Sequence, residues 1–301
     1  MLTEMLDSNT LVNVFNSDAE SDGEDSPTPE IRLIDAAKAC DLDALRRALA
    51  EGCDVNYREP DSAMFSQGYS ALHHLCTSSR RPSQRLACVL ELIARGADVN
   101  LRAGDSKYPS PPIANAVRLS SLEVVKALID AGADVNMALP ESANAPGLTA
   151  LHTAAIFACP ESIRLLVAAG ADVDAVAHNM QRAETPLEAA IRYKATGAPM
   201  FVDYTRTFAC LVRAGARIPT HPRHPSLRYL DAVAAAGGFA RYERAHRTRL
   251  AAIFIPKFPQ LPAEVVHHIL PFWADVGDAS RDRVRMIQRP KVDFSIINAE
   301  K

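Results

Sequence analysis

The stretch VVKALIDAGADVN, at Val124–Asn136, combines an apolar helical stripe with a glycine and a polar turn. Gly132 should end the helix, because glycine adopts the left-handed conformation of a helix C-terminus at the least cost. Asp134 and Asn136 are typical turn residues. The apolar side chains recur at the spacing of one helix face and predict an amphipathic helix; they are Val124, Val125, Leu128 and Ile129.

The same ending returns along the chain, and a second phrase precedes most of its copies. The endings are GCDVN at Gly52–Asn56, GADVN at Gly96–Asn100, GADVD at Gly170–Asp174 and a degraded GARIP at Gly215–Pro219. The second phrase reads SALHH from Ser70, TALHT from Thr149 and TPLEA from Thr185. A two-part unit that repeats along a chain is the signature of a solenoid.

Five units are predicted, over residues 31–56, 68–100, 108–136, 147–174 and 183–218. Residues at equivalent places in successive endings lie 36 to 45 positions apart. The first unit lacks the second phrase, as expected of a terminal repeat that needs one polar outer face. In the second unit the connection SSRRPS, at Ser78–Ser83, is expected to lead to a helix at Leu86–Ala94. In the fifth unit the insertion KATGAP, at Lys194–Pro199, separates the two expected helices.

These phrases resemble ankyrin repeats over residues 31–219, more than half of the chain. The resemblance implies an all-α solenoid whose units each contain two antiparallel helices and a projecting β-hairpin. It also implies that His73 and His152 bridge groups between repeats. From the residues themselves, we expect the hydroxyls of Thr149 and Thr185 to cap helices. Three leucines should point into the core: Leu72, Leu151 and Leu187.

Residues 1–30 form an acidic arm with eight acids and neither Lys nor Arg. SDAESDGEDSPTPE, at Ser17–Glu30, has almost no large apolar side chain, so it cannot bury enough surface to offset the entropy of ordering. A solubilising tail is the simpler interpretation. The alternative is regulation by phosphorylation at Ser17, Ser21, Ser26 and Thr28, which precede acids or prolines.

Residues 220–301 carry 13 Lys and Arg side chains, in a region expected to be helical. Helices are predicted at Leu227–Ala236 and Ala240–Phe254, and a cap over the last repeat is the simpler role. The second helix carries Arg241, Arg244, Arg247 and Arg249, but a nucleic-acid site would need a denser basic patch with aromatic residues.

LPAEVVHHILPFW, at Leu261–Trp273, resembles the opening helix of an F-box (LPxExxxxIL). In that family the apolar face docks a Skp-type linker of cullin-based ubiquitin ligases. The docking residues would be Leu261, Pro262, Val265, Val266, Ile269, Leu270 and Trp273. The later Val-Cys and Trp of an F-box do not appear in Asp275–Lys301, so a plain hydrophobic cap is the other interpretation.

Motifs for catalysis are missing from the sequence, and we expect neither an enzyme nor a cofactor. There is no GxSxG, GxxxxGK[ST], HExxH or dinucleotide fingerprint. His221, His224, His267 and His268 have no Cys or carboxylate at a zinc spacing, so no metal is expected. The six cysteines form no CxxC pair, which favours free thiols in cytoplasm or nucleus. No apolar run approaches the length of a membrane span.

The sequence therefore predicts a monomeric, non-enzymatic scaffold or adaptor that binds another protein on the concave ankyrin surface. A substrate receptor of a ubiquitin ligase is the alternative. Large side chains left exposed by the phrases are the candidate contacts, because Tyr and Arg often dominate interface energy. They are Tyr57, Arg58, Tyr69, His74, Arg102, Tyr108, Arg118, Phe157 and Tyr193.

Overall fold

The computed structural model describes residues 27–60, 68–103, 109–179, 182–195, 204–219 and 228–257. The paired helices are α1 Pro29–Ala39, α2 Leu42–Ala50, α3 Ala71–Thr77, α4 Pro82–Ala94, α5 Pro112–Arg118, α6 Leu122–Asp130, α7 Ala150–Ile156, α8 Pro160–Ala168, α9 Pro186–Ala195 and α10 Tyr204–Arg213. They are followed by α11 Arg228–Ala235, α12 Phe239–Phe254 and a 3₁₀ turn at Ile255–Lys257.

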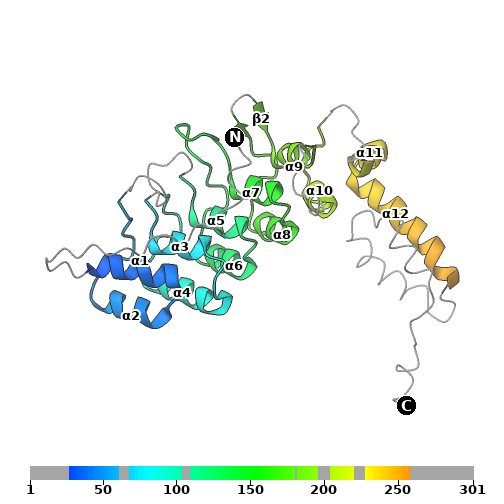
Figure 1. Cartoon of the computed structure of the whole chain (residues 1–301). Coiled ribbons are helices and arrows are strands. Elements are labelled where there is room, and N and C mark those ends of the chain that lie inside the picture. Colours follow the sequence, from blue (N-terminus) through cyan, green and yellow to red (C-terminus); the bar gives the residue numbers. More distant parts are fainter. Residues whose placement is uncertain are drawn as a thin grey trace, which may run out of the picture.

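The helices form two parallel layers, which gives the predicted all-α solenoid (Figure 1). In one layer α1, α3, α5, α7 and α9 each contact the next; in the other, α2, α4, α6, α8 and α10 do the same. Each unit therefore leans mainly on its neighbours, as expected of a repeat protein.

Local sequence accounts for the helix ends. Thr149 accepts a hydrogen bond from the His152 N–H at 3.4 Å, and Thr185 accepts one from Glu188 at 3.3 Å, so both predicted caps are confirmed. Gly132 follows the C-cap of α6 with φ +88°. Left-handed glycine occurs at the same place in the other endings, with φ between +85° and +101°.

Three expected boundaries differ from the structure. Helix α1 begins at Pro29, two residues inside the predicted arm, and Thr28 caps it through its hydroxyl. Helix α4 begins at Pro82 rather than Leu86, because proline at the first helical position loses no hydrogen bond. Helix α9 continues to Ala195, into the expected insertion.

A continuous core fills the space between the layers. Leu72, Leu151 and Leu187 are buried, as predicted, and so are Leu128 and Leu166. Many small alanines, including Ala154 and Ala155, have no exposed surface and allow neighbouring helices to approach closely. All six cysteines are free, and five of them are buried in this core.

The C-terminal helices pack on the last repeat. Helix α12 contacts α10, and Tyr229, Leu230 and Val233 of α11 belong to the same core as the repeats. The Arg213 guanidinium lies 5.4 Å from the centre of the Phe239 ring, and Arg213 also pairs with Glu243. These contacts agree with a cap. Within the described residues, no helix has the length and apolar character needed to cross a membrane.

Candidate protein-binding surface

The chain between the first two repeats folds back as a hairpin against α3. Arg58 and Ser70 form an antiparallel bridge, and the Glu59 N–H donates to the Tyr69 carbonyl at 3.0 Å. A second hairpin pairs β1, Ala177–Asn179, with β2, Arg182–Glu184, in antiparallel register. The first hairpin places two of the predicted contact residues, Arg58 and Tyr69, beside the start of α3.

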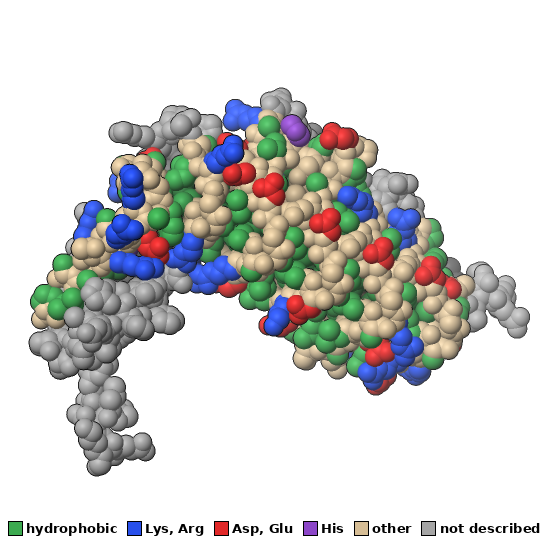
Figure 2. Space-filling model, turned by 180° about the vertical axis from the view of Figure 1, so that it is seen from behind, with side chains coloured by type: hydrophobic (Ala, Val, Ile, Leu, Met, Phe, Trp, Pro, Cys, Tyr) green, Lys and Arg blue, Asp and Glu red, His purple; other side chains and the backbone are tan. Residues whose placement is uncertain are grey.

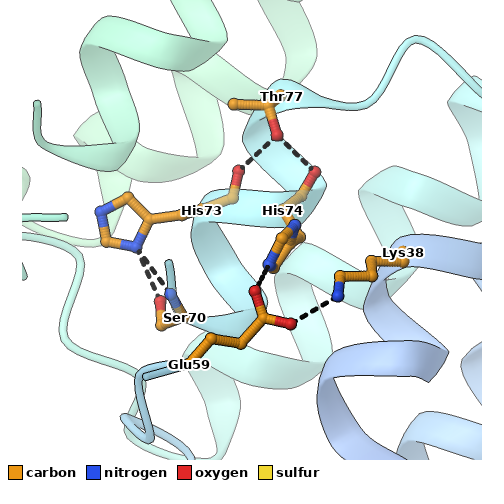
Figure 3. A network of polar contacts seen from close by, with 6 residues as sticks. All are labelled: Lys38, Glu59, Ser70, His73, His74 and Thr77. Atoms are coloured by element: carbon orange, nitrogen blue, oxygen red, sulfur yellow. Dashed lines mark hydrogen bonds and ion pairs between the residues drawn. The ribbon is translucent and has the colours of Figure 1, made fainter. Parts of the chain in front are cut away.

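Glu59 joins three segments through one carboxylate (Figure 3). One oxygen accepts a hydrogen bond from Lys38 of α1, and the other lies 2.9 Å from His74 Nε2 of α3. Burial acts to raise the pKa of Glu59, but the bonds from Lys38 and His74 outweigh it and hold that pKa below its usual value. The network therefore fixes His74 to the hairpin.

His73 points away from Glu59 and caps its own helix. Its Nδ1 lies 2.8 Å from the Ser70 hydroxyl and accepts from the Ser70 N–H, so it helps satisfy the start of α3. Burial lowers the pKa of His73 to about 4. The Ser110 carbonyl of the next repeat acts in the opposite direction, although Nε2 has no hydrogen bond of normal geometry among the described residues.

His152 occupies the equivalent place in α7. Its Nδ1 lies 2.9 Å from the Thr149 hydroxyl, and its Nε2 lies 3.1 Å from the Glu184 carbonyl of the next repeat. Burial lowers the pKa of His152 as well, with the Glu184 carbonyl opposing the shift. His152 therefore bridges two repeats as the ankyrin resemblance implied.

Tyr69 lies at the centre of the predicted contacts. Its ring stacks on His73, with centroids 5.5 Å apart, and meets His74 edge-on at the same distance. Burial raises the pKa of Tyr69, while the positive charge of Arg118 opposes the rise. The charge of Arg58 acts on His73. Tyr69, His74, Arg58 and Arg118 are thus brought together by α3, α5 and one hairpin.

The remaining predicted contacts lie elsewhere or are less open. Tyr57 is half-buried against the core. Phe157 is 46% exposed, but it follows α7 in the fourth repeat. Tyr193 is half-buried in α9, with the Arg192 guanidinium 4.5 Å from its ring centre. Arg102, next to the Ala103 N–H that donates to the Ser110 carbonyl at 3.2 Å, is half-buried, and Tyr108 falls outside the described residues.

Sequence reasoning missed Lys38 and Glu59, which position the surface. Glu59 carries no motif of its own, although it follows the ending of the first repeat directly. Lys38 directly follows Ala36-Ala37 in α1, and Arg118 directly follows Ala116-Val117 in α5, so the two residues occupy equivalent positions. Aligning the repeats position by position was the signal that could have identified Lys38.

Two other groups of predicted residues are not placed by the structure. Ser17, Ser21 and Ser26 lie outside the described residues, and so does the whole segment 261–273 with its seven candidate docking residues. Thr28 is described, and its hydroxyl is a helix cap 3.4 Å from the Ile31 nitrogen. A phosphate there would stand at the N-terminus of α1.

Metal ligands, thiols and a basic groove are the remaining features of the described residues. No group of three or more His, Cys, Asp or Glu side chains within them is arranged to hold a metal ion. Burial raises the pKa of Cys76 to about 12 and that of Cys88 to about 11, so both thiols stay protonated at neutral pH. An open groove on α12, about 490 Å³, is lined mainly by Arg241, Arg244, Thr248 and Arg249.

Comparison with known proteins agrees with the helical stack. A family model described as ankyrin repeats (3 copies) matches residues 33–138, 82–178 and 113–204. The chain is also 31% identical over 159 residues to a protein named E3 ubiquitin-protein ligase KEG from Arabidopsis thaliana. That alignment covers 52% of this chain and only 9% of the Arabidopsis protein. The family model covers more than half of the chain, and the chain therefore belongs to the ankyrin-repeat family.

Proposed function

We propose that this chain is a non-enzymatic adaptor that binds another protein on the face formed by α1, α3, α5 and the first hairpin. The family membership supports a protein-interaction role. The observation that carries the proposal is the group around Tyr69, where a half-buried ring held by two histidine rings lies near the exposed Arg58 and Arg118.

The physical argument is pre-organisation. Tyr69 is held by two histidine rings, and His74 is itself held by Glu59, so little side-chain entropy remains to be lost on binding. Arg58 and Arg118 are exposed, and no ion pair joins either of them to a described residue. Such a surface can supply both an aromatic contact and charge-assisted hydrogen bonds to a partner.

The test compares two double variants in affinity purification from cells. Tyr69→Ala with Arg118→Ala should abolish the capture of specific partners that the unmodified chain retains. Arg47→Ala with Lys126→Ala is the matched control, because both side chains are exposed on α2 and α6, in the helix layer that does not form the proposed face. Equal partner recovery from both double variants would refute the proposed binding face.

A second candidate is the substrate receptor of a cullin-type ubiquitin ligase. It is supported by the LPAEVVHHIL phrase at Leu261–Leu270 and by similarity to a protein named as a ubiquitin ligase. The purified chain should then bind a purified Skp-type linker, and Ile269→Asp with Leu270→Asp should remove that binding. A chain that never binds the linker would exclude this role and leave the adaptor role intact.

The free thiols support a reducing compartment for this protein. All six cysteines are unpaired, and burial raises the pKa of the thiols of Cys76, Cys88 and Cys159. Thiols usually persist in cytoplasm and nucleus and are often oxidised in secreted proteins. Imaging of the full chain with a fluorescent fusion would test this placement.

A further inference from the structure

Three arginines lie near the stacked rings of Tyr69 and His73, and they are called here the cationic cluster: Arg58, Arg102 and Arg118. The positive charge of Arg58 acts to lower the pKa of His73, and that of Arg118 acts to lower the pKa of Tyr69. The two rings stack on each other. Arg102 directly follows Leu101, whose backbone carbonyl acts to raise the pKa of His73. The cluster therefore draws one residue from each of two hairpin regions and one from α5.

Acidic partners for this cluster are missing within the described residues. Glu59, the described acid next to Arg58 in the chain, already bonds Lys38 and His74. Several other cations of the array are paired, as Arg46 is with Glu91 and Arg192 is with Glu184. Among the described residues, the three arginines of the cluster thus have no carboxylate partner.

Arg102 gives the second indication of an anionic ligand. Its Nη1 atom is enclosed, and it has no hydrogen-bond partner among the described residues. An enclosed guanidinium nitrogen without an acceptor loses hydration and gains nothing in return. A carboxylate beside it would supply a charge-assisted hydrogen bond.

The chain itself carries an anionic segment of suitable length next to the cluster. Asp18–Asp25 contains five acids and no base, and it ends two residues before Pro27, where the described chain begins. The nine steps from Asp18 to Pro27 can span about 30 Å when extended. Helices α1, α3 and α5 are successive neighbours, and packed helices lie about 10 Å apart. The acidic segment can therefore reach the cluster.

We propose that Asp18–Asp25 binds within its own chain to the cluster formed by Arg58, Arg102 and Arg118. The segment then covers Tyr69, and any acidic partner has to displace it. Tethering makes even a weak contact effective, because the segment stays at high local concentration. This contact stands whether or not the array also binds another protein.

The other exposed group of arginines is a poorer match for the segment. Arg241, Arg244 and Arg249 line a groove on α12, which packs on α10 at the opposite end of the stack from α1 (Figure 1). The stack contains five successive helix pairs, and the four spacings between them add up to about 40 Å. Figure 2 shows basic side chains gathered at the end of the molecule where α12 lies. The distance exceeds the reach of the acidic residues.

The experiment measures competition by the segment in the full chain. A fluorescein-labelled peptide of residues 15–28 is titrated with the unmodified chain and with an arm-neutral chain, and fluorescence anisotropy reports binding. The arm-neutral chain carries Asp18→Asn, Glu20→Gln, Asp22→Asn, Glu24→Gln and Asp25→Asn. We expect it to bind the peptide about tenfold more tightly, because the tethered competitor has been removed.

Arginine variants of the arm-neutral chain locate the site. Arg58→Gln with Arg102→Gln and Arg118→Gln should weaken peptide binding at least about tenfold. Since Arg102 is half-buried, Arg58→Gln with Arg118→Gln serves as a second variant that keeps the enclosed side chain. Arg244→Gln with Arg249→Gln on α12 is the matched control and should leave binding unchanged. Circular dichroism and thermal melting verify the fold of each variant.

Three results would overturn the proposal. These are equal binding by the unmodified and arm-neutral chains, failure of the peptide to bind either chain, and loss of binding in the α12 control in place of the cluster variants. Failure to capture a partner protein would not affect any of these measurements. The outcome for the segment is therefore distinct from the outcome for the adaptor role.

Discussion

The amide of Asn136 joins the third repeat to the fourth. Its Oδ1 accepts the backbone N–H of Asp172 at 2.7 Å, and its Nδ2 donates to the Gly170 carbonyl at 3.0 Å. Asn100 makes the same two bonds to Asp134 and Gly132, at 2.8 and 3.3 Å. The asparagine that ends the repeated phrase thus links successive repeats through two hydrogen bonds.

Removing these two hydrogen bonds should destabilise the array. Asn136→Ala leaves the Asp172 N–H and the Gly170 carbonyl to water, and we expect a loss of about 1 kcal/mol in the free energy of unfolding. Urea denaturation followed by circular dichroism measures it. Asn144→Ala, at an exposed asparagine that does not end a repeated phrase, is the control. Equal stability of the two variants would contradict a structural role for Asn136.

Truncation of the repeated leucines should cost considerably more. Leu128 and Leu166 have no exposed surface, so Leu128→Ala or Leu166→Ala should lower the free energy of unfolding by about 2–5 kcal/mol. Leu90 is 49% exposed on α4, and Leu90→Ala should change it by less than about 0.5 kcal/mol. Similar losses at all three positions would show that burial does not set the stability.

Glycine at one inter-helix turn should stabilise the chain. Ala158 has φ +50°, a left-handed conformation that costs a non-glycine residue about 1–2 kcal/mol. Part of that gain is offset by the greater freedom of glycine in the unfolded chain, so Ala158→Gly should add a few tenths to about 1 kcal/mol. Ala155→Gly, inside α7, should destabilise instead. Thermal denaturation of the pair decides the sign.

Acid should destabilise the array through its buried histidines. The pKa of His73 falls from 6.5 to about 4 on folding, so the unfolded chain binds more protons between these values. Its contribution is fully present above pH 6.5 and is lost as pH falls toward 4, about 3 kcal/mol in all. His73→Gln should flatten unfolding free energy against pH in this window, while the exposed His178→Gln should not. An unchanged slope in His73→Gln would contradict this assignment.

Much of the fold follows from local sequence. The capping hydroxyls of Thr149 and Thr185, the left-handed Gly132 and the buried Leu151 each depend on neighbours within a few residues or on the stripe of a single helix. The early start of α4 at Pro82 was missed because the arginine-rich connection has no apolar stripe.

The sequence by itself determined the helical repeats and the core, since both depend on short-range periodicity. Only the tertiary structure decided which polar side chains meet on the surface. Lys38, Glu59 and His74 come from three segments whose contact depends on hairpin geometry and on stacking of α1 against α3. Side-chain direction across repeats has no local code, so the grouping of Tyr69 with Arg118 emerges only when the repeats are packed.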